Sequence, residues 1–126
     1  MKVNLTDTSF IIHFRRDSND RLFNLRCILR YFDTYINYGE LFIINDDSII
    51  DPEIDEISKE YPKVSLAFYQ NDSVYKRTHC FNKIAKIASK RVLCFYDTDT
   101  LVKPIYLSLS LIHISEPTRQ AEISYA

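Results

Sequence analysis

The sequence predicts an α/β fold, a Rossmann-like and mostly parallel sheet with flanking helices. Four short apolar runs have the character of buried strands, at residues 9–14, 41–44, 64–69 and 92–96. The segments between them are long enough to hold helices, and such crossovers favour parallel strands with right-handed connections. Polar residues follow the runs directly, so a ligand site is expected at the carboxyl edge of the sheet.

The first strand and the first helix are predicted at residues 9–14 and 21–38. A polar stretch at residues 15–20 ends the strand and contains residues that commonly cap helices. Apolar residues then recur at helical spacing, at Leu22, Leu25, Ile28, Leu29, Phe32 and Ile36. Gly39, the only glycine in the chain, follows where a helix C-terminus favours a left-handed residue.

The remaining elements continue the same alternation. Asp51 and Pro52 open a second helix after the second strand, because proline is tolerated at the first helical position. The third strand leads through a polar loop into a third helix, which Thr78 is expected to cap. The fourth strand runs directly into an Asp-Thr-Asp triplet at residues 97–99.

Composition indicates a single globular domain. The chain has 126 residues, of which 46% are hydrophobic and 13% aromatic, and this excludes a disordered protein. A net charge of −1 leaves no basic excess, so nucleic acid is not expected as a partner. No apolar run approaches the ~20 residues of a transmembrane helix, and the polar N-terminus lacks a signal-peptide core. We therefore expect a cytoplasmic protein without a transmembrane segment.

The spacing of cysteine and histidine shows no pattern typical of a metal site. The cysteines are far apart and include no Cys-x-x-Cys pair, at Cys27, Cys80 and Cys94. The histidines are scattered as well, at His13, His79 and His113. We expect neither a disulfide framework nor a zinc site, and interpret the cysteines as reduced thiols that pack as small hydrophobic groups.

The tail from Leu109 to Ala126 differs in composition from the rest of the chain. It contains no Asp, Asn, Lys or Phe, although these residue types are frequent before it. Its sequence resembles a translated sequencing adapter with an index and a primer segment. We therefore expect residues 109–126 to be non-native and poorly packed, and residues 1–108 to be the truncated N-terminal part of a longer protein.

The Asp97-Thr98-Asp99 triplet is the strongest candidate for chemistry. Two carboxylates at the end of a buried strand are costly unless a cation or hydrogen-bond donors neutralise them. The usual solution is Mg²⁺ or Mn²⁺, held by the carboxylates and completed by water and diphosphate oxygens. The alternative interpretation is a solvated turn between the strand and the next loop.

Other motifs give this triplet a context. Arg77 comes just before the third helix and Asn82 follows five residues later, ahead of the strand that ends in the triplet. The first strand ends in Arg15-Arg16-Asp17, and the second ends in an acidic pair, Asp46-Asp47, followed by Ser.

In this order and spacing, residues 9–104 resemble the N-terminal half of GT-A-fold nucleotide-sugar glycosyltransferases of family-2 type. The similarity is greatest to galactosyltransferase-like and chondroitin-polymerase-like members. Ile84 is a departure, because the family has glycine two residues after the Asn. This difference affects how closely the third helix can approach a nucleotide.

The resemblance implies a role for each matching residue. Asp97 and Asp99 would hold Mn²⁺ or Mg²⁺ and, through the ion, the diphosphate. Arg77 would contact the diphosphate, since a guanidinium suits paired oxygens. Asp46, or its neighbour Asp47, would accept hydrogen bonds from the base or ribose. The residues implied to bind the nucleotide sugar are Arg15, Asp17, Asp46, Asp47, Arg77, Asn82 and Asp97.

The resemblance also implies a reaction, the transfer of a hexose from a UDP-sugar donor to a glycan acceptor. In inverting members a carboxylate takes the proton of the acceptor hydroxyl. This base lies well beyond the Asp-x-Asp motif in the family, so we expect no catalytic residue in this chain and little activity from it alone. The full-length protein could still associate peripherally with a membrane.

Two other functions stay open at this point. Residues 92–101 are similar to the paired-Asp motif of haloacid-dehalogenase-like phosphatases, but Leu101 occupies the place of the expected Thr. That motif also normally opens its domain, whereas here it follows three strand–helix units. The second alternative is a fragment that binds nucleotide without catalysing a reaction. A Walker-type nucleotidase is excluded, because a chain with one glycine has no phosphate-cradling loop.

Overall fold

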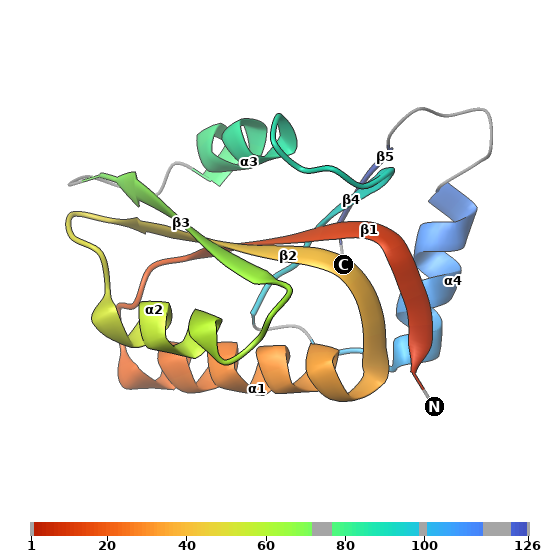
Figure 1. The fold of residues 1–126 in the computed structure, drawn as a ribbon, viewed down its shortest axis with the longest axis horizontal. Helices are drawn as coiled ribbons and strands as arrows, with labels where there is room; N and C mark the ends of the chain where they lie inside the picture. Colours follow the sequence, from red (N-terminus) through yellow and green to blue (C-terminus); the bar gives the residue numbers. More distant parts are fainter. Residues whose placement is uncertain (1, 72–76, 99–100, 115–121, 126) are drawn as a thin grey trace.

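A computed structural model describes residues 2–71, 77–98, 101–114 and 122–125, and it confirms the α/β prediction (Figure 1). The elements follow in the order β1 (Val3–Phe14), α1 (Asn19–Tyr35), β2 (Ile36–Asp47), α2 (Pro52–Lys59), β3 (Val64–Gln70), α3 (Arg77–Ala85), β4 (Val92–Phe95), α4 (Pro104–Ile114) and β5 (Glu122–Tyr125). The strands form one sheet in the order β3-β2-β1-β4-β5, and each described strand pair is parallel.

Helices cover both faces of this sheet. α1 and α2 lie on one face and α3 lies on the other (Figure 1). The larger core cluster joins the sheet to α1 and α2 and includes Phe10, Ile12, Phe32, Ile43 and Ile57. A smaller cluster joins it to α3, through Ile11, Ile44, Cys80, Phe81, Ile84 and Phe95. Alternate residues of β1 and β2 therefore face different layers, as the two-residue period of a strand requires.

The strand order reverses direction at β1. The chain places β2 and β3 in succession on one side of β1, and then returns to place β4 on the other side. Connections to the two neighbours of β1 consequently leave from opposite faces of the sheet, and the reversal point lies between the carboxyl ends of β1 and β4. Open parallel sheets bind their ligands at such a reversal.

The first two strands extend beyond their apolar runs. β1 begins at Val3 and β2 at Ile36, whereas the apolar runs predicted strands from residues 9 and 41. Val3 pairs with Ile36, so backbone hydrogen bonding to a neighbouring strand defines these ends, rather than a hydrophobic pattern. The first helix ends early, at Tyr35, because Ile36 already has extended backbone angles.

Gly39 is not a helix C-cap, and this prediction is wrong. The residue lies within β2 and has no positive φ angle. The register between β1 and β2 shifts between Leu5 and Ser9, next to Gly39. A Cβ atom at this position would lie 2.5 Å from the carbonyl oxygen of Thr6 and 2.9 Å from that of Thr8. Glycine is therefore required for the close approach of two backbones at a bulge.

The helix starts agree in part with the predicted caps. The Asp51 side chain accepts a hydrogen bond from the backbone N–H of Glu53 at 3.0 Å, which confirms that Asp51 and Pro52 open α2. α3 already begins at Arg77. Thr78 consequently lies inside its first turn, and the predicted capping role of Thr78 is wrong.

The tail contributes the C-terminal half of α4 and an edge strand. α4 runs to Ile114, and β5 pairs with β4 in parallel register from Glu122 to Tyr125. This pairing differs from the expected poor packing of residues 109–126. Its physical reason is that the open edge of β4 can accept backbone hydrogen bonds from any extended segment. Across the described ranges, no helix combines the length and apolar character that a membrane span requires.

Candidate functional site

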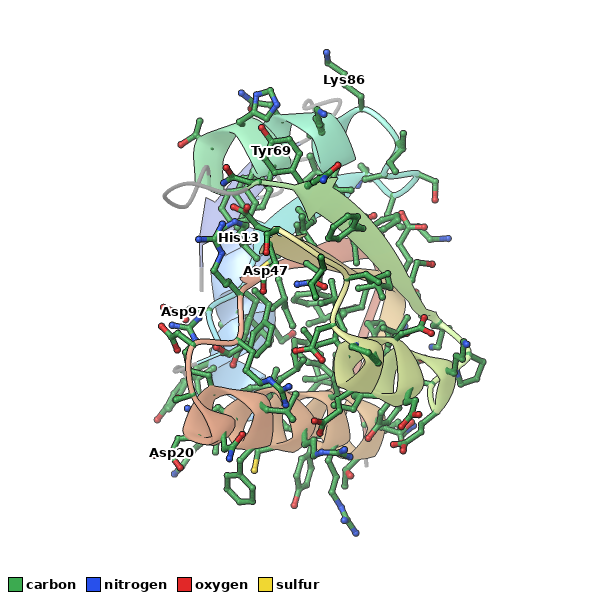
Figure 2. The ribbon with its side chains drawn as sticks, turned by 90° about the vertical axis from the view of Figure 1, so that its left-hand side faces the viewer. His13, Asp20, Asp47, Tyr69, Lys86 and Asp97 are labelled. Atoms are coloured by element: carbon green, nitrogen blue, oxygen red, sulfur yellow. The ribbon has the colours of Figure 1, made fainter. Side chains whose placement is uncertain are left out.

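The carboxyl ends of the strands form one polar edge of the molecule. Figure 2 looks onto this edge, with His13 from β1, Asp47 from β2 and Asp97 after β4 all on the side facing the viewer. Sequence reasoning expected this gathering of polar residues, because parallel strands end at the same edge of a sheet. The structure divides them into three neighbourhoods, centred on Asp46, on Asp47 and on Asp97.

Asp46 is a buried carboxylate with donors around both oxygens. Its side chain has 0% exposure. One carboxylate oxygen, Oδ2, lies 2.7 Å from His13 Nε2. The other, Oδ1, accepts hydrogen bonds from Asn71 Nδ2 at 2.9 Å and from Arg15 Nη2 at 3.2 Å. These partners satisfy a group that would otherwise be very costly to bury.

Arg15 connects the ends of three strands. Its Nε donates to the backbone carbonyl of Asp46, and its Nη2 donates to the carbonyl of Asn71 at 3.2 Å. Arg15 follows β1, Asp46 lies near the end of β2 and Asn71 follows β3. The guanidinium, with 21% exposure, therefore fixes the arrangement of the edge and leaves only a small part of its surface toward solvent.

Cys80 approaches the same carboxylate from α3. Its Sγ lies 3.8 Å from Asp46 Oδ2, and the cysteine is buried. Burial, followed by the negative charge of Asp46 and the hydrogen bond to it, raises the pKa of the Cys80 thiol to about 11. The thiol is therefore protonated at neutral pH and donates its hydrogen to the carboxylate. A second contact between β1 and α3 is made by the His13 ring, which packs edge-on against the Phe81 ring with centroids 6.1 Å apart.

Asp47, in contrast to Asp46, reaches the surface. Its Oδ1 accepts the backbone N–H of Ser48 at 2.8 Å, and it borders a shallow pocket of about 220 Å³. Arg16 forms one wall of this pocket, held by Asp51 at 3.1 Å and by Glu53 at 2.8 Å. The pocket residues are Arg16, Asp47, Ile49, Ile50, Asp51 and Pro52. Of the predicted acidic pair, Asp47 is the member available to a ligand.

Asp97 lies at the end of β4, next to the end of β1. Its side chain is half-buried, and the backbone N–H of Tyr96 still donates to the carbonyl of Ile11 at 2.9 Å. Within the described part of the chain, the buried hydroxyl of Thr98 has no hydrogen-bond partner. Asp99, the other predicted metal ligand, lies outside the described residues.

The other predicted site residues lie away from Asp46. Asp17 is exposed and faces Arg21 one helical turn later, at 3.6 Å. Asn82 is exposed on α3. Arg77 is the first residue of α3, and its side chain lies outside the described part of the structure. The geometry thus joins Arg15 with Asp46 and leaves Asp17 and Asn82 separate from that group.

Three residues of the Asp46 group were not predicted, namely His13, Asn71 and Cys80. His13 could have been predicted as a site residue, because it is a polar residue inside an apolar strand. The two-residue period of the strand places it on the same face as Ile11, which packs against α3. Cys80 gave no comparable signal, since a buried cysteine is common in a core.

Comparison with known proteins yields no match to a family model, to a curated protein or to a solved structure. The function therefore has to follow from the fold, from the groups at its carboxyl edge and from the motif resemblance. Of these, the fold and the placement of Arg15, Asp46, Asp47 and Asp97 are described by the structure.

Proposed function

We propose that the chain binds a nucleotide diphosphate sugar, as the nucleotide-binding half of a GT-A-type hexosyltransferase. The observation that carries the proposal is the reversal of strand order at β1. It places the carboxyl end of β1, which Arg15, Arg16 and Asp17 follow, beside the carboxyl end of β4, which Asp97 follows. Ligands of open parallel sheets bind at such a place, and the motif resemblance assigns these segments to the nucleotide sugar.

The donor atoms at the end of β4 suit a divalent cation. Asp97 offers carboxylate oxygen, the ligand that Mg²⁺ and Mn²⁺ prefer, and the buried hydroxyl of neighbouring Thr98, which has no hydrogen-bond partner among the described residues, is a further oxygen close to it. Asp97 and Asp99 would hold the ion, which when bound offsets negative charge on the diphosphate.

The acidic pair at the end of β2 has two different tasks in this proposal. Both oxygens of Asp46 are engaged inside the protein, so Asp46 positions Arg15 and the strand ends. Asp47 lies at a pocket and is the acceptor for a hydroxyl or N–H of the nucleoside. The sequence left open which of the two would contact the nucleoside, and the burial of Asp46 favours Asp47.

The donor is a uridine diphosphate sugar and the acceptor is a glycan, as the resemblance implies. We assign no general base to the described residues, because the family places that group far beyond the Asp-x-Asp motif. Binding without efficient transfer is therefore the activity expected of this chain. The loss of a positioned base alone lowers rates by about 10²- to 10⁴-fold.

Calorimetric titration with UDP tests the proposal. Binding in the presence of Mn²⁺ should weaken about 10- to 100-fold in Asp97→Asn, the range seen when a metal site is disturbed. Asp20→Asn is the matched control, because Asp20 is an exposed carboxylate on α1 (Figure 2). Equal affinity for UDP with Mn²⁺ and with a chelator would contradict the proposed metal role. Equal weakening by both substitutions would contradict the proposed site.

A further inference from the structure

We propose that His13, Asp46 and Cys80 form a second metal site, which takes a zinc-like divalent transition-metal ion. The potential ligand atoms Nε2, carboxylate oxygen and Sγ all lie within 4.8 Å of one another. They come from three elements, β1, β2 and α3, so only the folded protein brings them together. The site shares Asp46 with the proposed nucleotide site, where Asp46 positions Arg15, but it does not include Asp47 or Asp97, the residues proposed to contact the nucleoside and the diphosphate-bound ion.

The burial of the three side chains distinguishes this group from a chance surface cluster. The His13 side chain is 4% exposed and that of Asp46 is 0% exposed. Cys80 is 1% exposed. Polar groups buried to this degree need specific partners, and His13 and Cys80 both contact the same atom, Asp46 Oδ2, so an ion bound between them would meet all three ligands at one point.

The chemical nature of the donors selects the class of ion. One imidazole nitrogen, one carboxylate oxygen and one sulfur form a mixed set that suits Zn²⁺. Mg²⁺ and Ca²⁺ prefer oxygen ligands, so this set discriminates against the ions expected at Asp97. Three protein ligands leave one position of a tetrahedral ion for water or another small ligand.

Neighbouring residues orient the carboxylate for this role. Arg15 and Asn71 hold Oδ1, which leaves Oδ2 directed toward His13 and Cys80. Such outer contacts fix the geometry of metal-binding carboxylates. The carboxylate and a Cys80 thiolate supply two negative charges to the divalent cation, and the ion pair with Arg15 adds one positive charge beside it. A pocket of about 60 Å³ borders Cys80, next to Lys83 and Tyr69.

Metal binding exchanges two contacts for three metal–ligand bonds. Without the ion, His13 Nε2 and Asp46 Oδ2 are hydrogen-bonded at 2.7 Å. Two ligands of a tetrahedral zinc ion lie about 3.3 Å apart, given bonds of about 2.0 Å, so the two side chains separate slightly. Cys80 binds as thiolate, and its proton is released to the solvent.

Titration of the whole chain with Co²⁺ tests the proposal, because cobalt bound to thiolate has an intense charge-transfer absorption. We expect one Co²⁺ per chain with this absorption, and its loss when Zn²⁺ is added in competition. Cys80→Ser should abolish the absorption, whereas Cys94→Ser should preserve it. Cys94 is a suitable control, since it is equally buried but lies in the core cluster on the other face of the sheet.

A second measurement on the unmodified protein covers the case in which Cys80→Ser does not fold. Zn²⁺ should slow the alkylation of Cys80 in mild denaturant and leave that of exposed Cys27 unchanged, as mass spectrometry of the labelled peptides would show. Absence of the charge-transfer absorption in the unmodified protein would overturn the proposal. The proposal would also be overturned if the charge-transfer absorption persisted in folded Cys80→Ser. Equal alkylation of Cys80 with and without Zn²⁺ would overturn it too.

Discussion

At the scale of single residues, Asp46 does most to organise the carboxyl edge. Its carboxylate has contacts with side chains from β1, from the end of β3 and from α3. Removing one partner of such a group leaves the others buried and unsatisfied. The free energy of unfolding should therefore depend strongly on Asp46, whatever ligand the protein binds.

We predict that Asp46→Ala lowers the free energy of unfolding by about 3 kcal/mol, because it leaves His13 and Arg15 without their shared acceptor. Urea unfolding measures this difference. Asp33→Ala, at an exposed position of α1, is the control and should change stability by less than about 0.5 kcal/mol. Similar losses in both variants would show that the Asp46 network adds little stability.

Glu40 makes the stability sensitive to acid. Burial raises the pKa of Glu40, but hydrogen bonds from Ser9 at 2.6 Å and from Ser89 at 2.7 and 3.1 Å outweigh this effect, with help from the charge of Lys90. The net pKa is lowered from its ordinary value of 4.5. The charged form therefore stabilises the fold above the unfolded-state pKa, and this contribution is lost as pH falls through the folded-state value.

The corresponding prediction compares the unmodified protein with Glu40→Gln in urea at a series of pH values. The stability difference between them should be largest near neutral pH and should shrink as the pH falls below 4.5. A difference that stays constant between pH 7 and pH 3 would mean that the Glu40 charge has no role.

At the scale of elements, hydrophobic patterns predicted β1 to β4 and α1 to α3 but not where these elements end, and they did not predict α4 or β5. The apolar runs coincide with the buried centres of β1, β2 and β4, because burial on both faces demands consecutive apolar residues, whereas the residues of β3 are partly or fully exposed. Val3 and Ile36 begin their strands through mutual pairing, and no local pattern reveals such pairing.

Gly39 is the clearest example of this limit. A lone glycine after a helical pattern suggested a cap, whereas the structure uses it where β1 and β2 approach at a bulge. We predict that Gly39→Ala lowers stability by about 1–3 kcal/mol, because backbone atoms must move to admit the methyl group. Asn37→Ala, at an exposed position of the same strand, should have a smaller effect on thermal unfolding. Equal effects would contradict the close approach.

The tail gives a second prediction at this scale. Its resemblance to a sequencing adapter implies that residues 109–126 did not evolve with the domain, although β5 pairs with β4. Deleting these residues should leave the midpoint of thermal unfolding and the affinity for UDP nearly unchanged, since only one short edge strand and the C-terminal half of α4 are lost. A large fall in the midpoint would identify the tail as a structural part of the domain.

At the scale of the whole molecule, the sheet order explains why some of the site was predictable. Asp47 ends β2 and Asp97 lies two residues after β4, and strand ends of a parallel sheet meet at one edge. The group of His13, Asp46 and Cys80 could not be predicted in this way. Its members are far apart in the chain, and only the packing of α3 on β1 and β2 unites them.

The sheet order also separates two chemical environments. Asp97 offers oxygen at the reversal point between β1 and β4, whereas the Asp46 group offers nitrogen, oxygen and sulfur beneath α3. We therefore expect two cations, an oxygen-preferring ion at Asp97 and a zinc-like ion at His13, Asp46 and Cys80. One belongs to the proposed nucleotide site and the other stabilises the packing of α3 on the sheet.

A crystal structure of the chain with UDP and Mn²⁺, with the anomalous signal of manganese recorded, tests the central claim most directly. We predict a manganese peak beside Asp97, with the diphosphate bridging toward the segment after β1 and the nucleoside near Asp47. UDP bound elsewhere, or a manganese peak only at His13, Asp46 and Cys80, would contradict the proposed nucleotide site.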